Sequence, residues 1–138
     1  MIWKKDFNIE DLNGKNGAYI NPFQIEFIEK GDDYLMCKMP VLDISKQPMG
    51  LLHGGVSVYL AETIGSYAGF VCIKELNKAA VGLEINANHI KSVKSGFVYA
   101  KATPLHIGGK THVWNIEITN DKQELTCICR LTLAVVSI

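Results

Sequence analysis

The sequence shows no excess of either charge and contains no long apolar run. Fourteen Lys and Arg residues balance fourteen Asp and Glu residues in 138 positions, so no overall field attracts nucleic acid or an anionic membrane. No apolar stretch reaches the roughly 18 residues that a membrane-spanning helix needs. The first residues also lack the apolar run and cleavage site of a signal peptide. We therefore expect a cytoplasmic protein with neither nucleic acid nor membrane as a partner.

Cysteine is scarce, and its spacing does not suit a metal site. The four residues are Cys37, Cys72, Cys127 and Cys129, without the paired spacing of zinc ligands. We expect reduced thiols in the core, as cytoplasmic proteins have, and no bound metal. The sequence also lacks repeats and low-complexity linkers, and 48% of its residues are hydrophobic. This composition predicts one globular domain over residues 1–138.

Apolar periodicity predicts one long helix and about six strands. The helix covers roughly residues 54–74, and a short helix in "DFNIEDLNG" uses Asp6 as its cap. The predicted strands lie in "FQIEFIE", "YLMCKMPVL", "AVGLEINANHI", "FVYAKATPL", "HVWNIEI" and "LTCICRLTLAV". In the third of these, alternation places Val81, Leu83, Ile85 and Ala87 on one apolar face.

Consecutive hairpins favour an antiparallel sheet with one apolar face. The long helix is the only long apolar element that can cover this face. The predicted fold class is therefore α+β, with a curved antiparallel sheet of about six strands wrapped around a long central helix.

The long helix, within "GLLHGGVSVYLAETIGSYAGF", carries a single carboxylate. Apolar residues surround its axis, which predicts a helix buried on all sides. An unpaired buried carboxylate is costly, so Glu62 is a candidate functional group rather than a solvated surface charge. Ser66 lies one turn further on, where its hydroxyl can orient the carboxylate.

His53, Gly54 and Gly55 stand where this helix begins. The first N–H groups of a helix lack partners and lie at the positive end of its dipole. Glycine lets a ligand approach them closely, so they can hold a carbonyl oxygen and stabilise an oxyanion. The alternative is that both glycines only form a tight turn into the helix.

The spacing between these two features has a consequence for assembly. Glu62 follows His53 by nine positions, about 13 Å along the helix axis and half a turn around it. The two groups therefore cannot serve one reacting carbonyl within a single chain. If both act, Glu62 of one subunit faces His53 and Gly54 of another, which requires a homodimer with two equal sites.

Four segments together carry a family resemblance: "QPMGLLHGG", "AETIGS", "VGLEINANHIKSVKSG" and "PLHIGGKTHVW". They resemble the hotdog-fold acyl-CoA thioesterases, in the branch with 4-hydroxybenzoyl-CoA thioesterase and the phenylacetate-pathway type. The likeness is closest to bacterial enzymes that hydrolyse 1,4-dihydroxy-2-naphthoyl-CoA in menaquinone synthesis and to the proofreading thioesterases of enterobactin synthesis. The resemblance covers essentially the whole chain. It implies a hotdog fold, a dimer that pairs into a tetramer, and no cofactor beyond the coenzyme A of the substrate.

The resemblance also implies roles for individual residues. Glu62 is the nucleophile or general base, the N–H of Gly54 polarises the thioester carbonyl, Gln47 and His53 support that oxygen, and Ser66 provides the hydroxyl. Residues that would contact substrate or coenzyme A are Gly55, Gly82, His89, Ile90, Lys91, Ser92, His106, Ile107, Gly108, Gly109, Lys110 and Thr111. Among these, Lys91 and Lys110 can pair with phosphates, and the two glycines can offer N–H groups. The alternative for each lysine is an ordinary solvated side chain.

The resemblance leaves several functions open. The first is hydrolysis of an aromatic acyl-CoA, with 1,4-dihydroxy-2-naphthoyl-CoA or a related aroyl-CoA as substrate. The second is release of aroyl groups from an acyl or aryl carrier protein, and a third is broad-specificity hydrolysis of acyl-CoA. A dehydratase of 3-hydroxyacyl thioesters and a non-catalytic acyl-CoA-binding domain are less favoured. The candidate walls of an aryl pocket are Trp3, Phe7, Tyr59, Tyr67 and Phe70. The alternative for most of these residues is an ordinary place in the hydrophobic core.

Overall fold

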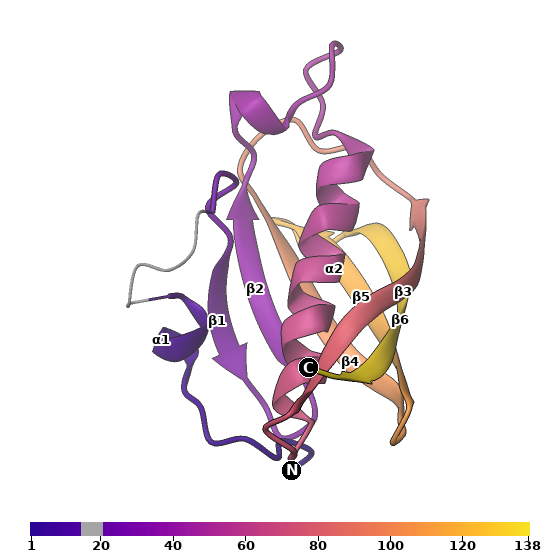
Figure 1. The fold of residues 1–138 in the computed structure, drawn as a ribbon. Helices are drawn as coiled ribbons and strands as arrows, with labels where there is room; N and C mark the ends of the chain where they lie inside the picture. The colour runs from indigo at the N-terminus through magenta and orange to yellow at the C-terminus, as the bar shows by residue number, and fades with distance from the viewer. Residues whose placement is uncertain (15–20) are drawn as a thin grey trace.

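A computed structural model describes residues 1–14 and 21–138 of the chain (Figure 1). Its elements are α1 (Ile9–Leu12), β1 (Glu26–Lys30), β2 (Leu35–Pro40), a 3-10 turn (Asp43–Ser45), α2 (Gly54–Val71), β3 (Lys78–His89), β4 (Phe97–Ile107), β5 (Thr111–Asn120) and β6 (Leu125–Ser137). In the described part of the chain, no helix has the length and apolar character to cross a membrane.

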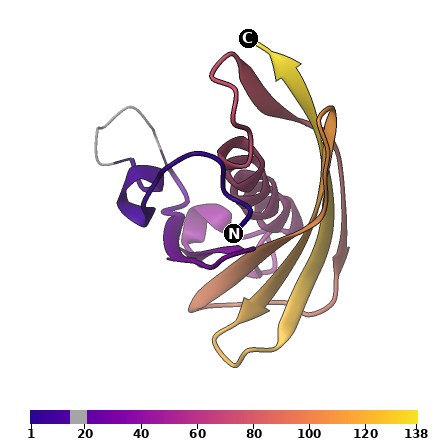
Figure 2. The ribbon, with the colours of Figure 1, turned by 90° about the horizontal axis from the view of Figure 1, so that it is seen from below.

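The six strands form one antiparallel sheet in the order β1-β2-β4-β5-β6-β3. The sheet curves around α2, as the view turned by 90° shows (Figure 2). This arrangement confirms the predicted α+β class, with one long helix inside a curved sheet. Helix α2 ends three residues earlier than expected, at Val71, whose carbonyl accepts N–H bonds from Lys4 (2.9 Å) and Lys5 (3.1 Å).

The short helix α1 begins at a different cap from the predicted one. Asn8, not Asp6, is its N-cap: the Asn8 side chain accepts from the N–H of Asp11 at 2.9 Å. The Asp11 carboxylate in turn accepts from the N–H of Asn8 at 2.8 Å. This reciprocal pair satisfies two helix-end donors, and Asp6 has no acidic partner at the matching spacing.

Helix α2 is buried on one face rather than on all sides. Leu60, Ala61, Ile64 and Ala68 are fully buried, and they follow the 3- and 4-residue spacing of a single helix stripe. They pack against the sheet, where Trp114 and Leu131 are also fully buried. On other sides of the helix, Tyr59 is 40% and Phe70 is 42% exposed. The expected burial all round is wrong for a single chain, because the sheet covers only one side of the helix.

Strand β3 lies at an edge of the sheet and departs from its predicted alternation. Ile85 and Ala87 pack against the core, but Val81 is 45% and Leu83 is 65% exposed. The register with β6 shifts between Gly82 and Glu84, and such a bulge reorients the side chains that precede it. The four residues therefore do not share one apolar face, and apolar side chains remain exposed along this edge.

The four cysteines are buried and unbridged, which confirms the prediction of reduced core thiols. Cys127 and Cys129 point the same way from β6, with their sulfur atoms 3.6 Å apart. Burial raises the pKa of Cys72 to about 12 and raises that of Cys37 further. At neutral pH these two groups are therefore protonated thiols.

Candidate active site

The N-terminus of α2 leaves one backbone donor without a partner. The His53 ring caps the helix, accepting from the N–H of Gly55 through Nδ1 at 2.8 Å. The His53 carbonyl accepts from Val56 (2.9 Å) and Ser57 (3.2 Å). Among residues 1–14 and 21–138, the N–H of Gly54 has no acceptor. Of the two glycines, Gly54 is therefore the one that offers a donor to a ligand oxygen.

The loop before the helix is held in place by backbone bonds. Gln47 donates its N–H to the Leu51 carbonyl (2.8 Å) and accepts from Gly50 (2.9 Å). Gly50 has φ +78, the left-handed region that glycine adopts at little cost. The Gln47 side-chain oxygen accepts from the N–H of Met49, and His53 donates its N–H to the Ser45 carbonyl (2.8 Å). These bonds fix Gln47 close to the helix start.

A cavity of about 310 Å³, here called the amide cavity, opens beside Gly54. It brings Gln47 and Gly54 together with the predicted segment His89, Ile90, Lys91 and Ser92. The His89 ring lies against the helix start, since a Cβ at Gly54 would be 2.9 Å from His89 Nε2. The structure thus assembles five predicted residues around the Gly54 donor, with Lys91 also paired to Glu124.

Five residues that line the amide cavity were not predicted as site residues: the apolar Leu51, Leu52 and Val93, and the polar Ser57 and Thr126. Ser57 lies one turn after Gly54 on the same helix, and this spacing was a usable signal. Thr126 comes from β6, and its carbonyl accepts the N–H groups of Ile90 (2.8 Å) and Lys91 (3.2 Å). That contact depends on the pairing of β3 with β6, for which the sequence carries no local signal.

Glu62 lines a second cavity, of about 360 Å³, here called the carboxylate cavity. Its other lining residues are Tyr59, Thr63, Ser66 and Tyr67, all from α2. Glu62 is half-buried and makes no hydrogen bond or ion pair within the described ranges. Ser66 therefore does not orient the carboxylate in the single chain, although it lies beside it. The carboxylate is free to meet a ligand or a second chain.

Gly82 on β3 makes room for the Glu62 carboxylate. A Cβ at this position would lie 2.4 Å from Glu62 Oε1, well inside van der Waals contact. The predicted substrate residue Gly82 is thus brought to Glu62, whereas His89, seven residues further along β3, is brought to Gly54.

The hairpin His106–Thr111 lies apart from both of these cavities. It borders a third cavity, of about 510 Å³, whose lining includes Ile107, Gly108, Gly109, Cys72 and Ile73. The last two follow the C-terminal end of α2, about 27 Å from its start by helix geometry. The N–H of Gly108 is already bonded to the Thr111 carbonyl at 2.9 Å. A single chain therefore does not bring this hairpin to Gly54. The N–H of Gly108, which was expected to bind a phosphate, is already occupied.

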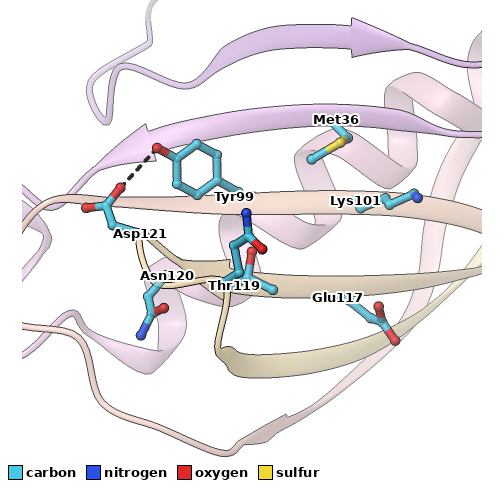
Figure 3. Close-up of a pocket in the computed structure, with 8 residues that line it drawn as sticks. Met36, Tyr99, Lys101, Glu117, Thr119, Asn120 and Asp121 are labelled. Carbon is cyan, nitrogen blue, oxygen red and sulfur yellow. Dashed lines mark hydrogen bonds between the residues drawn. The ribbon is translucent and has the colours of Figure 1, made fainter.

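The outer face of the sheet carries a further cavity of about 410 Å³ (Figure 3). Met36, Tyr99, Lys101 and Glu117 line it from β2, β4 and β5, with Asp121 from the following turn. The Tyr99 hydroxyl bonds to Asp121 at 3.0 Å, and this bond raises the pKa of Tyr99. None of the predicted site residues lines this cavity. The candidate chemistry therefore lies at α2, not on the outer face.

Comparison with known proteins identifies the family. The profile of the Thioesterase superfamily matches residues 49–127, which include the helix start, Glu62 and β3. The chain belongs to this superfamily. A 1,4-dihydroxy-2-naphthoyl-CoA hydrolase from Escherichia coli is 48% identical over 136 residues, covering 98% of this chain and 99% of the relative. The proofreading thioesterase EntH of Cronobacter turicensis is 40% identical, covering 98% of each chain.

Solved structures agree with this assignment. A thioesterase from Haemophilus influenzae superposes with a TM-score of 0.92 at 48% identity, covering 99% of this chain and 96% of the other. The thioesterase described here therefore has the hotdog fold that the sequence motifs implied, and its activity is hydrolysis of a thioester. In the single chain, Gly54 and Glu62 line different cavities, as their spacing predicts.

Proposed function

We propose that this thioesterase hydrolyses aromatic acyl-CoA esters to the free acid and coenzyme A, with 1,4-dihydroxy-2-naphthoyl-CoA as the first candidate. The proposal rests above all on Gly54, which lines the amide cavity and whose unpaired N–H is suited to a thioester oxygen. The similarity to a 1,4-dihydroxy-2-naphthoyl-CoA hydrolase over nearly the full chain supports the choice of 1,4-dihydroxy-2-naphthoyl as the acyl group. With that substrate, the enzyme would act in the cytoplasm in menaquinone synthesis.

The proposed reaction uses side-chain and backbone groups and water, without a cofactor. The thioester oxygen accepts from the N–H of Gly54, where the α2 dipole and the nearby Gln47 favour the developing negative charge. Glu62 of the partner subunit either attacks the carbonyl, giving a mixed anhydride that water opens, or deprotonates the attacking water. The coenzyme A thiolate then leaves, and it needs no strong acid to do so.

The geometry of one chain supports a shared site in a homodimer. Edge strand β3 pairs on one side with β6 and exposes Val81 and Leu83, and α2 exposes Tyr59 and Phe70. An exposed strand edge with apolar side chains is a surface that a second copy can cover by extending the sheet. A twofold axis there yields two equal sites. We propose this dimer, with two dimers pairing into a tetramer.

Thiol release across a panel of esters tests the proposed activity. The panel holds benzoyl-, 1,4-dihydroxy-2-naphthoyl-, phenylacetyl- and hexanoyl-CoA. We expect Glu62→Gln to lower turnover on the preferred ester by at least about 100-fold, because it removes the nucleophile or base. Glu117→Gln, on the outer face of the sheet, is the matched control and should retain turnover. Wild-type-like turnover in Glu62→Gln would refute the mechanism.

Mixing two variants that each remove one half of the proposed site tests whether the site is shared. In a heterodimer of Glu62→Gln with Gln47→Ala, both changes fall in one site and the other site is intact. Random exchange of subunits should therefore restore about a quarter of the wild-type activity. A site contained in one chain would regain nothing on mixing, and that result would refute the dimer arrangement.

A second candidate function is release of aroyl groups from a carrier protein. The similarity to a proofreading thioesterase favours it. Lys91, Lys94 and Lys122 lie around one cavity of about 350 Å³, which Asp121 and Glu124 also line. Lys91 pairs with Glu124, so Lys94 and Lys122 are the cations proposed to receive an acidic carrier. Comparing kcat/KM for one aroyl group on coenzyme A and on an aryl carrier protein decides between the two. The same assay separates hydrolysis from dehydration or mere binding, since neither of those releases a thiol.

A further inference from the structure

Two aromatic pairs connect the carboxylate cavity to the segment that leads into β1. Phe23 packs edge-on against Tyr59, with ring centroids 5.2 Å apart and an interplanar angle of 65°. Phe27 packs in the same way against Tyr67, at 5.1 Å and 67°. Both tyrosines line the carboxylate cavity, Tyr59 before Glu62 on α2 and Tyr67 after it. Residues 21–27, here called the N-terminal arm, thus contact both aromatic walls of this cavity.

Two asparagine side chains hold the arm in place. Asn21 donates to the Ile25 carbonyl (2.5 Å) and accepts from the Ile25 N–H (3.0 Å). Asn13 makes the same two-way contact with Phe27, at 2.9 Å and 2.7 Å. Phe27 lies in β1 and Ile25 directly precedes this strand, which is the edge strand opposite β3 (Figure 1). The asparagine amides satisfy backbone N–H and C=O groups that a neighbouring strand would otherwise pair with, so the arm is held without such a strand.

The backbone between the two phenylalanines is also constrained. Gln24 has φ +56, an uncommon conformation for a residue with a side chain. The N–H of Gln24 donates to the Asn21 carbonyl at 3.2 Å, which closes the bend. Phe27 is 3% exposed and anchored in the core, whereas Phe23 is half-buried and depends on this bend for its place. The Asn21 contacts and this bend thus bracket Phe23, whose ring lies against that of Tyr59.

We infer that the carboxylate cavity receives the acyl group and that Phe23 is a specificity-determining positioning residue, which holds Tyr59 as a fixed wall of this cavity beside Glu62. The inference rests on the proposed hydrolysis of aromatic thioesters. A planar acyl group gains from an aromatic wall held at a fixed angle, because ring pairs favour particular orientations. A flexible straight chain adapts to a wall that moves. The arm therefore contributes to the preference for aromatic over aliphatic acyl groups, without touching the reacting atoms.

The test compares two esters on the same protein preparation. Benzoyl-CoA and hexanoyl-CoA are assayed with wild type, Phe23→Leu, Tyr59→Leu and the double variant. The ratio of the two kcat/KM values does not depend on the fraction of folded protein, so a loss of stability cannot mimic the effect. Phe97→Leu changes the same residue type on the outer face of the sheet and is the matched control.

We expect Phe23→Leu to lower the aromatic-to-aliphatic ratio about 3- to 10-fold, the equivalent of one oriented ring pair. The change should come mainly from KM for benzoyl-CoA, and Asn21→Ala should act in the same direction. In the Tyr59→Leu background, Phe23→Leu should add little, because the ring that it positions is gone. Phe97→Leu should leave the ratio unchanged.

The outcomes separate this inference from the proposed function. An unchanged ratio in Phe23→Leu, or fully additive effects of Phe23→Leu and Tyr59→Leu, would overturn the role of the arm while leaving hydrolysis in place. Absence of thiol release by the wild-type protein on every ester would overturn the proposed function, and the inference with it.

Discussion

Replacing Gly82 with alanine should impair catalysis without unfolding the protein. A Cβ at Gly82 would lie 2.4 Å from Glu62 Oε1, so the carboxylate must move by about 1 Å to reach ordinary contact. Displacements of that size at a reacting group can cost about 100-fold in rate. The backbone at Gly82 lies outside the left-handed region, and alanine is favoured over glycine within a strand by roughly 0.5–1 kcal/mol. We therefore expect kcat to fall about 100-fold while stability stays equal or rises.

The assay pairs turnover with chemical denaturation and includes a double-mutant cycle. Glu62→Asp shortens the side chain and withdraws the carboxylate from the new methyl group. It should therefore cost less activity in the Gly82→Ala background than in wild type. Wild-type kcat in Gly82→Ala would refute the claim that the position of the carboxylate beside β3 determines the rate. A large loss of stability would refute the expected tolerance of the strand.

Three further predictions concern other parts of the molecule. Gly54→Ala places a Cβ 2.9 Å from His89 Nε2. The exposed His89 ring can move away, so we expect near-normal stability. Because the change lies at the proposed oxygen donor, kcat/KM for thiol release should fall about 10-fold. Desolvation, with a smaller effect of the His106 charge, lowers the pKa of buried His112. The unfolded chain therefore binds more protons than the folded one at mildly acidic pH. The free energy of unfolding should fall as the pH drops below about 6.5. Urea unfolding from pH 5 to 7.5 checks this, and His112→Gln should flatten the slope. The buried thiols, with the pKa of Cys72 raised to about 12, should react with a disulfide reagent slowly in buffer and rapidly in guanidinium.

The long helix and the sheet were predictable because each carries its own periodic pattern. The buried stripe from Leu60 to Ala68 repeats every three or four residues, and strands such as β5 alternate regularly in burial. The capping position of α1 was not predicted correctly, since Asp6 and Asn8 are both good caps. The choice between them depends on a reciprocal bond with Asp11.

The burial of α2 was overestimated for a reason that concerns assembly. Phe70 belongs to the apolar pattern of the helix but is 42% exposed. A pattern does not tell whether the sheet or a second chain covers a residue. The bulge in β3 is a similar case, because alternation across Val81 and Leu83 looks regular and the irregularity exists only in the pairing with β6. The sequence thus predicted the elements well and the exposed faces poorly.

The candidate site was predictable where its residues are close in sequence. Gly54 and His53 signalled a helix start, and Glu62 was conspicuous in a helix with few polar residues. The family resemblance named Gly82 and His89, but no local sequence pattern predicted that β3 would bring them to Glu62 and Gly54. These contacts arise only after a strand far along the chain packs beside the helix. Thr126 shows the same limit, since it reaches the amide cavity only through the pairing of β6 with β3.

Strand β3 connects both halves of the proposed site to the proposed interface. Its Gly82 faces Glu62, and its terminal His89 faces Gly54, so one strand sets the space around the carboxylate and around the backbone donor. The same strand is an edge of the sheet and exposes Leu83. A second copy that pairs with this edge would therefore act directly on the strand that borders Glu62 and Gly54. Dimer formation and the positioning of the catalytic groups are, on this geometry, properties of one element, and a change in the edge of β3 should affect both together.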